Sequence, residues 1–163
     1  MTEYKVKLTK VSRHPYLIME RDVDYRETKS MNEANKIVQM MNTVYGLDEM
    51  AEEYLYMVTL NSKCDVTGVF QIGHGSGNMC CASPRDVFTS ALLSGASGIV
   101  LAHNHPSGDV EPSKYDFDFT KRMVAGGEIL GVEVLDHIIV GNGNAMSMHQ
   151  ECPDVLDPKK IGE

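Results

Sequence analysis

The sequence predicts an α/β domain, because segments with strand character alternate with segments with helical character along most of the chain. With 163 residues, of which 42% are hydrophobic and 23% charged, the chain can bury a sizeable core and is most simply one domain. The apolar, β-branched segments that predict strands in this part of the chain are 54–60, 98–102, 132–135 and 137–140.

Residues 1–47 precede the clearest alternation, and we expect them to form a strand-helix extension packed on the core. Within this extension, residues 4–11 alternate apolar and polar side chains, which is typical of a half-buried strand. The apolar segment 16–19 predicts a second, short strand. Residues 48–163 then form the main domain, which ends in a short C-terminal tail.

A methionine-rich helix is predicted at the end of this extension. Ser30 and Glu33 have the spacing of a capping box, and Gly46 supplies an end near Tyr45. Its apolar residues recur at helical spacing and include several methionines: Met31, Met40 and Met41. Packing against the core is one interpretation of this stripe. A docking surface for a protein partner is the other, because methionine side chains adapt to varied ligands.

Two further helices are predicted from their first residues. Ser83 precedes a proline and has Asp86 three positions later, and Gly95 gives that helix an end. Ser113 and Asp116 have the same spacing before a helix that continues through Val124. The glycine-rich segment 73–77 predicts a turn, since the Gly-Lys-Ser/Thr of a phosphate-binding loop does not follow it.

The most informative residues follow the strand at 98–102. Side chains two positions apart on a strand point to the same side, so His103 and His105 should project together, and Asn104 to the opposite side. Two neutral imidazoles and one carboxylate, here Asp116, are the ligands of a catalytic zinc that keeps one position for water. Such an open zinc site usually performs hydrolysis. The alternative is a polar turn followed by a helix cap.

These residues carry a resemblance to a known family. His-Asn-His-Pro-Ser-Gly occupies 103–108, and ten residues separate His105 from Asp116. The pattern resembles the JAB/MPN domain with a JAMM zinc metalloprotease motif, and more closely its RadC-like branch. The resemblance covers roughly residues 48–149. Further matches to that branch are Ser-Pro-Arg-Asp-Val-Phe at 83–88, Pro112-Ser113, Thr120 and Leu-Asp-His-Ile-Ile-Val at 135–140.

The resemblance implies a fold and a metal. The JAB/MPN fold is a mixed β-sheet flanked by helices in three layers, related to cytidine deaminases. The family's motif carries over to His103, His105 and Asp116 as ligands of one Zn²⁺ per chain. It also implies that residues 48–163 form a RadC-like JAB/MPN domain.

The family's motif also contains a glutamate that lies before the strand at 54–60. Glu53 takes that position because it immediately precedes the strand, and Glu52 is its rival. In the family this glutamate is the general base that accepts a proton from water and passes it to the leaving amine. The serine that corresponds to Ser113 donates a hydrogen bond to the developing oxyanion.

Two functions follow as hypotheses. The first is a zinc-dependent metallohydrolase that cleaves a peptide or isopeptide bond in a peptide or protein-conjugate substrate. The second is a non-catalytic zinc-binding JAB module that acts in DNA repair or mobile-element biology. Within the segment 135–140, Asp136 and His137 suggest a structural pair more readily than a support for a metal ligand.

Composition bounds the partners. With 23 acidic and 15 basic residues the chain has a net charge of −8, which disfavours direct binding to a nucleic-acid backbone. No apolar stretch reaches the roughly 18 residues that a membrane-spanning helix needs, and we expect no membrane association. The N-terminus lacks the apolar core of a signal peptide, so a cytoplasmic location is expected.

Overall fold

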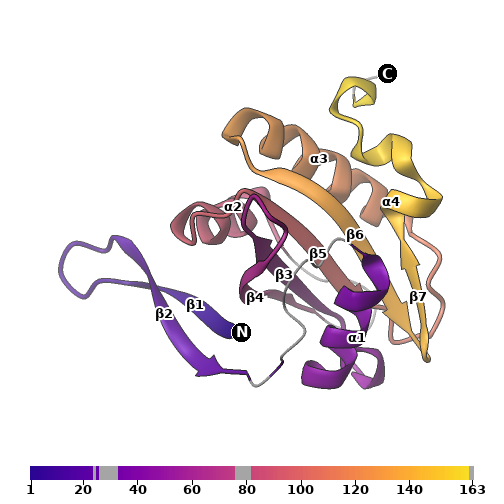
Figure 1. The fold of residues 1–163 in the computed structure, drawn as a ribbon, viewed down its shortest axis with the longest axis horizontal. Helices are drawn as coiled ribbons and strands as arrows, with labels where there is room; N and C mark the ends of the chain where they lie inside the picture. Colours follow the sequence, from indigo (N-terminus) through magenta and orange to yellow (C-terminus); the bar gives the residue numbers. More distant parts are fainter. Residues whose placement is uncertain (24, 26–32, 76–81, 162–163) are drawn as a thin grey trace.

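The strands that the structure describes form one mixed sheet with helices on both faces (Figure 1). The structure is a computed structural model that describes residues 1–23, 25, 33–75 and 82–161. The strand order is β2-β1-β4-β3-β5-β6-β7. The predicted α/β class, with a mixed sheet flanked by helices as in the JAB/MPN fold, is confirmed.

The helices and strands follow one another along the chain as shown by colour in Figure 1. Their bounds are β1 Thr2–Leu8, β2 Pro15–Asp22, α1 Ala34–Tyr45, β3 Tyr54–Leu60, β4 Val66–His74, α2 Pro84–Leu93, β5 Gly98–Asn104, α3 Lys114–Leu130, β6 Glu133–Gly141, β7 Asn144–Ser147 and α4 Met148–Glu151. Short 3₁₀ helices cover Leu47–Glu49, Pro153–Leu156 and Pro158–Lys160. Among the described residues, no helix is both long enough and apolar enough to cross a bilayer.

Strand β5 lies in the interior of the sheet between β3 and β6, and every one of its residues is buried. It pairs antiparallel with β3, so that Leu55 lies opposite His103. On its other side it pairs parallel with β6, where Leu101 lies opposite His137. An apolar, β-branched segment suits this position because both faces of a central strand are covered.

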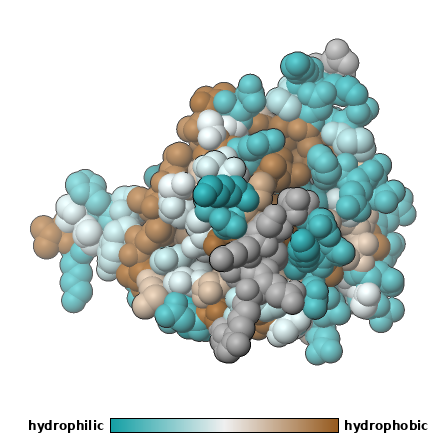
Figure 2. Space-filling model, in the orientation of Figure 1, coloured by the Kyte–Doolittle hydropathy of each residue, from teal (hydrophilic) through white to brown (hydrophobic). Residues whose placement is uncertain are grey.

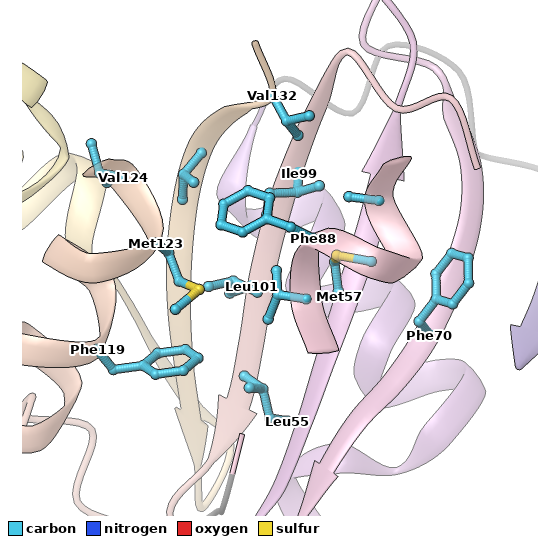
Figure 3. Packing of buried hydrophobic residues seen from close by; sticks show 13 residues of the cluster. Leu55, Met57, Phe70, Phe88, Ile99, Leu101, Phe119, Met123, Val124 and Val132 are labelled. Carbon is cyan, nitrogen blue, oxygen red and sulfur yellow. The ribbon is translucent and has the colours of Figure 1, made fainter. Parts of the chain in front are cut away.

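Alternating side chains of these strands fill two core layers. On one face, Leu101 of β5 packs with Met57 of β3 and with Phe88 and Met123, which come from α2 and α3 (Figure 3). On the other face, Val100 and neighbouring strand residues pack against α1. The residues of β5 thus alternate between the α2/α3 face and the α1 face.

The N-terminal strands form a hairpin that projects from the rest of the molecule (Figures 1 and 2). The structure places these strands at Thr2–Leu8 and Pro15–Asp22, so the predicted strand at 4–11 both begins and ends earlier. The hairpin joins the sheet where Glu3 of β1 pairs with Val69 of β4. The division of the chain at residue 47 stays a prediction.

Helix α1 begins at Ala34, and Glu33 precedes it in an extended conformation without a side-chain cap. Ser30, the predicted cap, lies outside the described residues, as does Met31. Met40 and Met41 are fully buried against the sheet, so the core-packing interpretation describes these two side chains. A protein partner that docks on this helix stays a prediction.

Strand β4 is the longest element that the sequence pattern does not predict, and β7 and α4 were not predicted either. It contains Gly68 and Gly73, which weaken a strand pattern. At Gly68 a side chain would lie 2.9 Å from the ring of Tyr4, so the glycine leaves room for that tyrosine. The turn predicted at 73–77 therefore starts within β4, and its later residues lie outside the described ones.

A glycine in α3 gives a test of the helix-to-strand packing. A Cβ at Gly127 would lie 2.3 Å from the carbonyl oxygen of Val132, which leads into β6. Gly127→Ala should therefore destabilise the fold by about 1–3 kcal/mol, although alanine normally stabilises a helix interior by about 1 kcal/mol over glycine. Urea denaturation measures the difference. At Gly126 the closest neighbour is the ring of Phe88, which can shift, so Gly126→Ala should cost less. Equal or greater stability of Gly127→Ala would contradict this packing.

Candidate metal centre

The three residues predicted as metal ligands come together at one end of β5. His103 lies in that strand, His105 follows it, and Asp116 lies in the first turn of α3. The Nε2 atoms of the two histidines are 3.0 Å apart. The Asp116 carboxylate oxygens lie 3.2 Å from Nε2 of His103 and 3.5 Å from Nε2 of His105. The first of these distances is to Oδ1 and the second to Oδ2. Ligand atoms about 2.1 Å from a tetrahedral ion are roughly 3.4 Å from one another, so the three side chains are close enough together to share one zinc ion.

The outer nitrogens of both imidazoles already have partners. Nδ1 of His105 lies 2.7 Å from the backbone oxygen of Asp109, which can only accept, so Nδ1 carries the proton and Nε2 has a lone pair. Nδ1 of His103 lies 2.8 Å from Nε2 of His137. The Nε2 atoms of both histidines therefore face the carboxylate of Asp116. Lone pairs of two nitrogens and one carboxylate then point toward one another, and a bound cation would satisfy all three.

Burial and mutual contacts determine the charges in this cluster. Burial alone would raise the pKa of Asp116, but its close contacts with the two imidazoles and the hydrogen bond from Ser113 outweigh burial and hold that pKa well below its usual range. The nearby Asp116 carboxylate in turn raises the pKa of His105, against the opposing effect of burial. Asp116 is thus a fixed anion, and His105 faces it with only partial exposure to solvent.

Ser113 holds Asp116 through a capping box at the start of α3. The hydroxyl and the backbone N–H of Ser113 donate to Oδ2 of Asp116 over 2.6 and 2.7 Å. In return the backbone N–H of Asp116 donates to the Ser113 hydroxyl over 3.2 Å. The capping box predicted from the sequence is present, and the serine proton points at the carboxylate.

Glu53 lies beside the cluster, whereas Glu52 does not. Glu53 is 7% exposed and lines a small cavity together with His103 and Asp116. Its charge also contributes to the raised pKa of His105, behind the larger effect of Asp116. Glu52 is exposed and pairs with Nε2 of His74 over 2.6 Å. The structure therefore brings Glu53, and not its rival, to the ligand set.

Asn104 points away from its two histidine neighbours, as the strand alternation predicts. Its side-chain oxygen accepts from the backbone N–H of Tyr54 over 2.8 Å. Its amide donates to the backbone oxygens of Met50 and Glu52 over 3.2 and 2.9 Å. The middle residue of the His-Asn-His motif thus fixes the segment that carries Glu53.

The structure does not support the interpretation of Asp136 and His137 as a structural pair of side chains. The Asp136 carboxylate accepts from the backbone N–H of His137, from the Ser147 hydroxyl and from the backbone at the start of α4, whereas no hydrogen bond joins it to the His137 ring. The ring instead lies between His103 and the hydroxyl of Thr120. Adjacent strand residues point to opposite faces, so the strand predicted here could have indicated that the side chains of Asp136 and His137 point apart.

The comparison with protein families agrees with this geometry. The model of the RadC-like JAB domain matches residues 29–153. The chain belongs to this family. The matched range contains β3 to β6 and every residue of the cluster described above.

Curated relatives carry the name UPF0758 protein. One from Moorella thermoacetica is 46% identical over 107 residues, which are 64% of this chain and 47% of the relative. One from Enterococcus faecalis is 40% identical over 124 residues, or 76% of this chain and 51% of the relative. One from Caldanaerobacter subterraneus subsp. tengcongensis is 43% identical over 102 residues, or 63% and 44%. The chain spans about half the length of the curated relatives that it matches.

Replacement of Asn104 tests whether its side chain fixes the backbone segment just before β3. Asn104→Ala leaves one N–H and two carbonyl groups near Glu53 without their partner, which should lower the free energy of unfolding by roughly 1–3 kcal/mol. Chemical denaturation measures the change. The exposed Asn144 is the matched control, and Asn144→Ala should change stability by less than about 0.5 kcal/mol. A similarly small effect of Asn104→Ala would show that this side chain does not hold the segment.

Proposed function

We propose that this protein is a zinc-dependent metallohydrolase that cleaves a peptide or isopeptide bond. The observation that carries the proposal is the convergence of His103, His105 and Asp116, three acceptors with tetrahedral spacing, beside the buried carboxylate of Glu53. A purely structural zinc site would be closed by a fourth protein ligand, and among the described residues the cluster contains three.

Zinc held by these ligands would supply Lewis acidity that activates water and polarises a carbonyl group. The protein's own contribution is the placement of its acid and base groups. Glu53 is outside the ligand set yet lines the same cavity, so it can accept a proton from water and deliver it to a leaving amine. No covalent nucleophile is needed for this direct attack by water.

Ser113 is the proposed donor to the oxyanion that develops on the cleaved carbonyl. Its hydroxyl is exposed to solvent and lies at the edge of the cluster. Because its proton points at Oδ2 of Asp116, the hydroxyl must rotate away from the carboxylate to serve an oxyanion. The backbone N–H of Ser113 keeps its bond to Asp116 during that rotation.

Metal content tests the binding part of the proposal. Purified protein should contain about one zinc per chain by elemental mass spectrometry, and Asp116→Ala should lose most of it. Asp86→Ala is the matched control because Ser83 and Asp86 form the same capping box on α2 away from the metal centre. This variant loses a helix cap of similar geometry but should keep its zinc. Equal zinc in the wild type and in Asp116→Ala would refute the ligand assignment.

Glu53→Gln tests the catalytic part. The amide cannot carry the proton, so hydrolysis should fall by about 10²-fold or more while zinc content stays unchanged. The substrates are fluorogenic peptides and peptides joined through a lysine ε-amide, screened first with the wild type. Glu52→Gln, one residue away and exposed, should retain activity.

The alternative function predicts a different pattern in the same experiments. A zinc-binding module without catalysis, in DNA repair or mobile-element biology, would hold its metal and hydrolyse none of these substrates. Undiminished hydrolysis by Glu53→Gln would overturn the assignment of the base. The net charge of −8 disfavours contact with a nucleic-acid backbone, so peptide or protein-conjugate substrates are the class to screen first.

A further inference from the structure

We propose that His137 and Thr120 are positioning residues that fix the tautomer and orientation of the metal ligand His103 and tie it to Asp116. This inference rests on the metal site of the proposed function and does not depend on hydrolysis. It concerns a buried relay of three hydrogen bonds between β5, β6 and α3.

The relay is continuous and excluded from solvent. Nδ1 of His103 lies 2.8 Å from Nε2 of His137, and Nδ1 of His137 lies 2.6 Å from the hydroxyl of Thr120. That hydroxyl lies 2.7 Å from the backbone oxygen of Asp116. Exposure is 2% for His103, 1% for His137 and zero for Thr120, so water does not supply alternative partners.

The direction of each hydrogen bond follows from its end at Asp116. A backbone oxygen can only accept, so the single hydroxyl proton of Thr120 is donated to it. The sulfur of Met148, 3.5 Å away, is a much weaker acceptor. The Thr120 oxygen must then accept from Nδ1–H of His137.

The same reasoning carries to the metal ligand. A neutral His137 that is protonated on Nδ1 has a lone pair on Nε2, so His103 must donate its Nδ1–H. The lone pair of His103 is then on Nε2, which faces Asp116 and His105.

The relay also connects two ligands from different elements. His103 belongs to a strand of the sheet, whereas Asp116 belongs to a helix that packs on it. Strand pairing fixes His137 beside His103, and Thr120 lies one helical turn after Asp116. The bonds through His137 and Thr120 therefore link the positions of both ligands before any metal binds.

Metal affinity tests this role. Thr120→Val keeps the shape but removes the hydroxyl, and His137→Leu removes the acceptor for His103. Each should weaken zinc binding by about 10- to 100-fold, measured by competition with a fluorescent chelator. Thr120→Ser restores the hydroxyl and should bind zinc within a few-fold of the wild type. His137→Gln offers an amide oxygen near Nε2 and should bind zinc more tightly than His137→Leu.

A control separates positioning from general stability. Thr59 is also fully buried, and its hydroxyl donates to a backbone oxygen of the neighbouring strand over 3.1 Å, away from the metal centre. Thr59→Val should lower the melting temperature without loss of zinc affinity. Wild-type affinity in Thr120→Val, or equal losses of affinity in Thr59→Val and Thr120→Val, would overturn the proposal.

The tautomers can be measured without any variant. In the metal-free wild type, two-bond ¹H–¹⁵N NMR near neutral pH should show His137 protonated on Nδ1 alone. Protonation of His137 on Nε2 would overturn the relay, whether or not the variants fold. If the wild type binds no zinc, the proposed function fails and this NMR measurement alone decides on the relay. If Glu53→Gln loses hydrolysis while Thr120→Val keeps its affinity, the relay fails and the proposed function stands.

Discussion

The pairing of β5 between β3 and β6 is the constraint on which the metal centre depends. The antiparallel register with β3 places Leu55 opposite His103, so the residues just before β3 lie at the metal-binding end of β5. The parallel register with β6 places His137 on the same face, diagonally beside His103. A shift of either strand by one residue would reverse its side chains to the other face. The sheet register thus selects the neighbours of the first ligand.

Alternation along the end of β5 separates two tasks between adjacent residues. His103 and His105 turn toward α3 and Asp116, while Asn104 turns toward the segment before β3. Asn104 accepts one hydrogen bond and donates two, and these bonds satisfy partly buried backbone groups at and before the start of β3. The motif therefore places two candidate ligands on one face of the strand, and on the other face it fixes the backbone segment that contains Glu53.

Particular residues show how far sequence reasoning reaches. The cluster of His103, His105 and Asp116 could be predicted because a two-residue period and the spacing of the motif can be read directly from the chain. Contact between His137 and His103 spans 34 residues and depends on strand register, which the sequence pattern does not contain. The glycine-containing β4 was missed because its strand conformation is stabilised by pairing with β3 and by the packing of Tyr4 against Gly68. Tertiary contacts decide these features.

The two capping boxes show why the Ser-x-x-Asp spacing by itself does not distinguish a candidate metal ligand from a helix cap. Ser83–Asp86 and Ser113–Asp116 share the same spacing, and in each the serine hydroxyl donates to the aspartate over 2.6 Å. Asp86 remains exposed, whereas Asp116 is 4% exposed beside His103. An unpaired buried carboxylate would be costly, and the donors of Ser113 offset part of that cost before any cation binds. The helix cap thus helps to keep Asp116 ionised and oriented, and the end of β5 places two histidines beside that carboxylate.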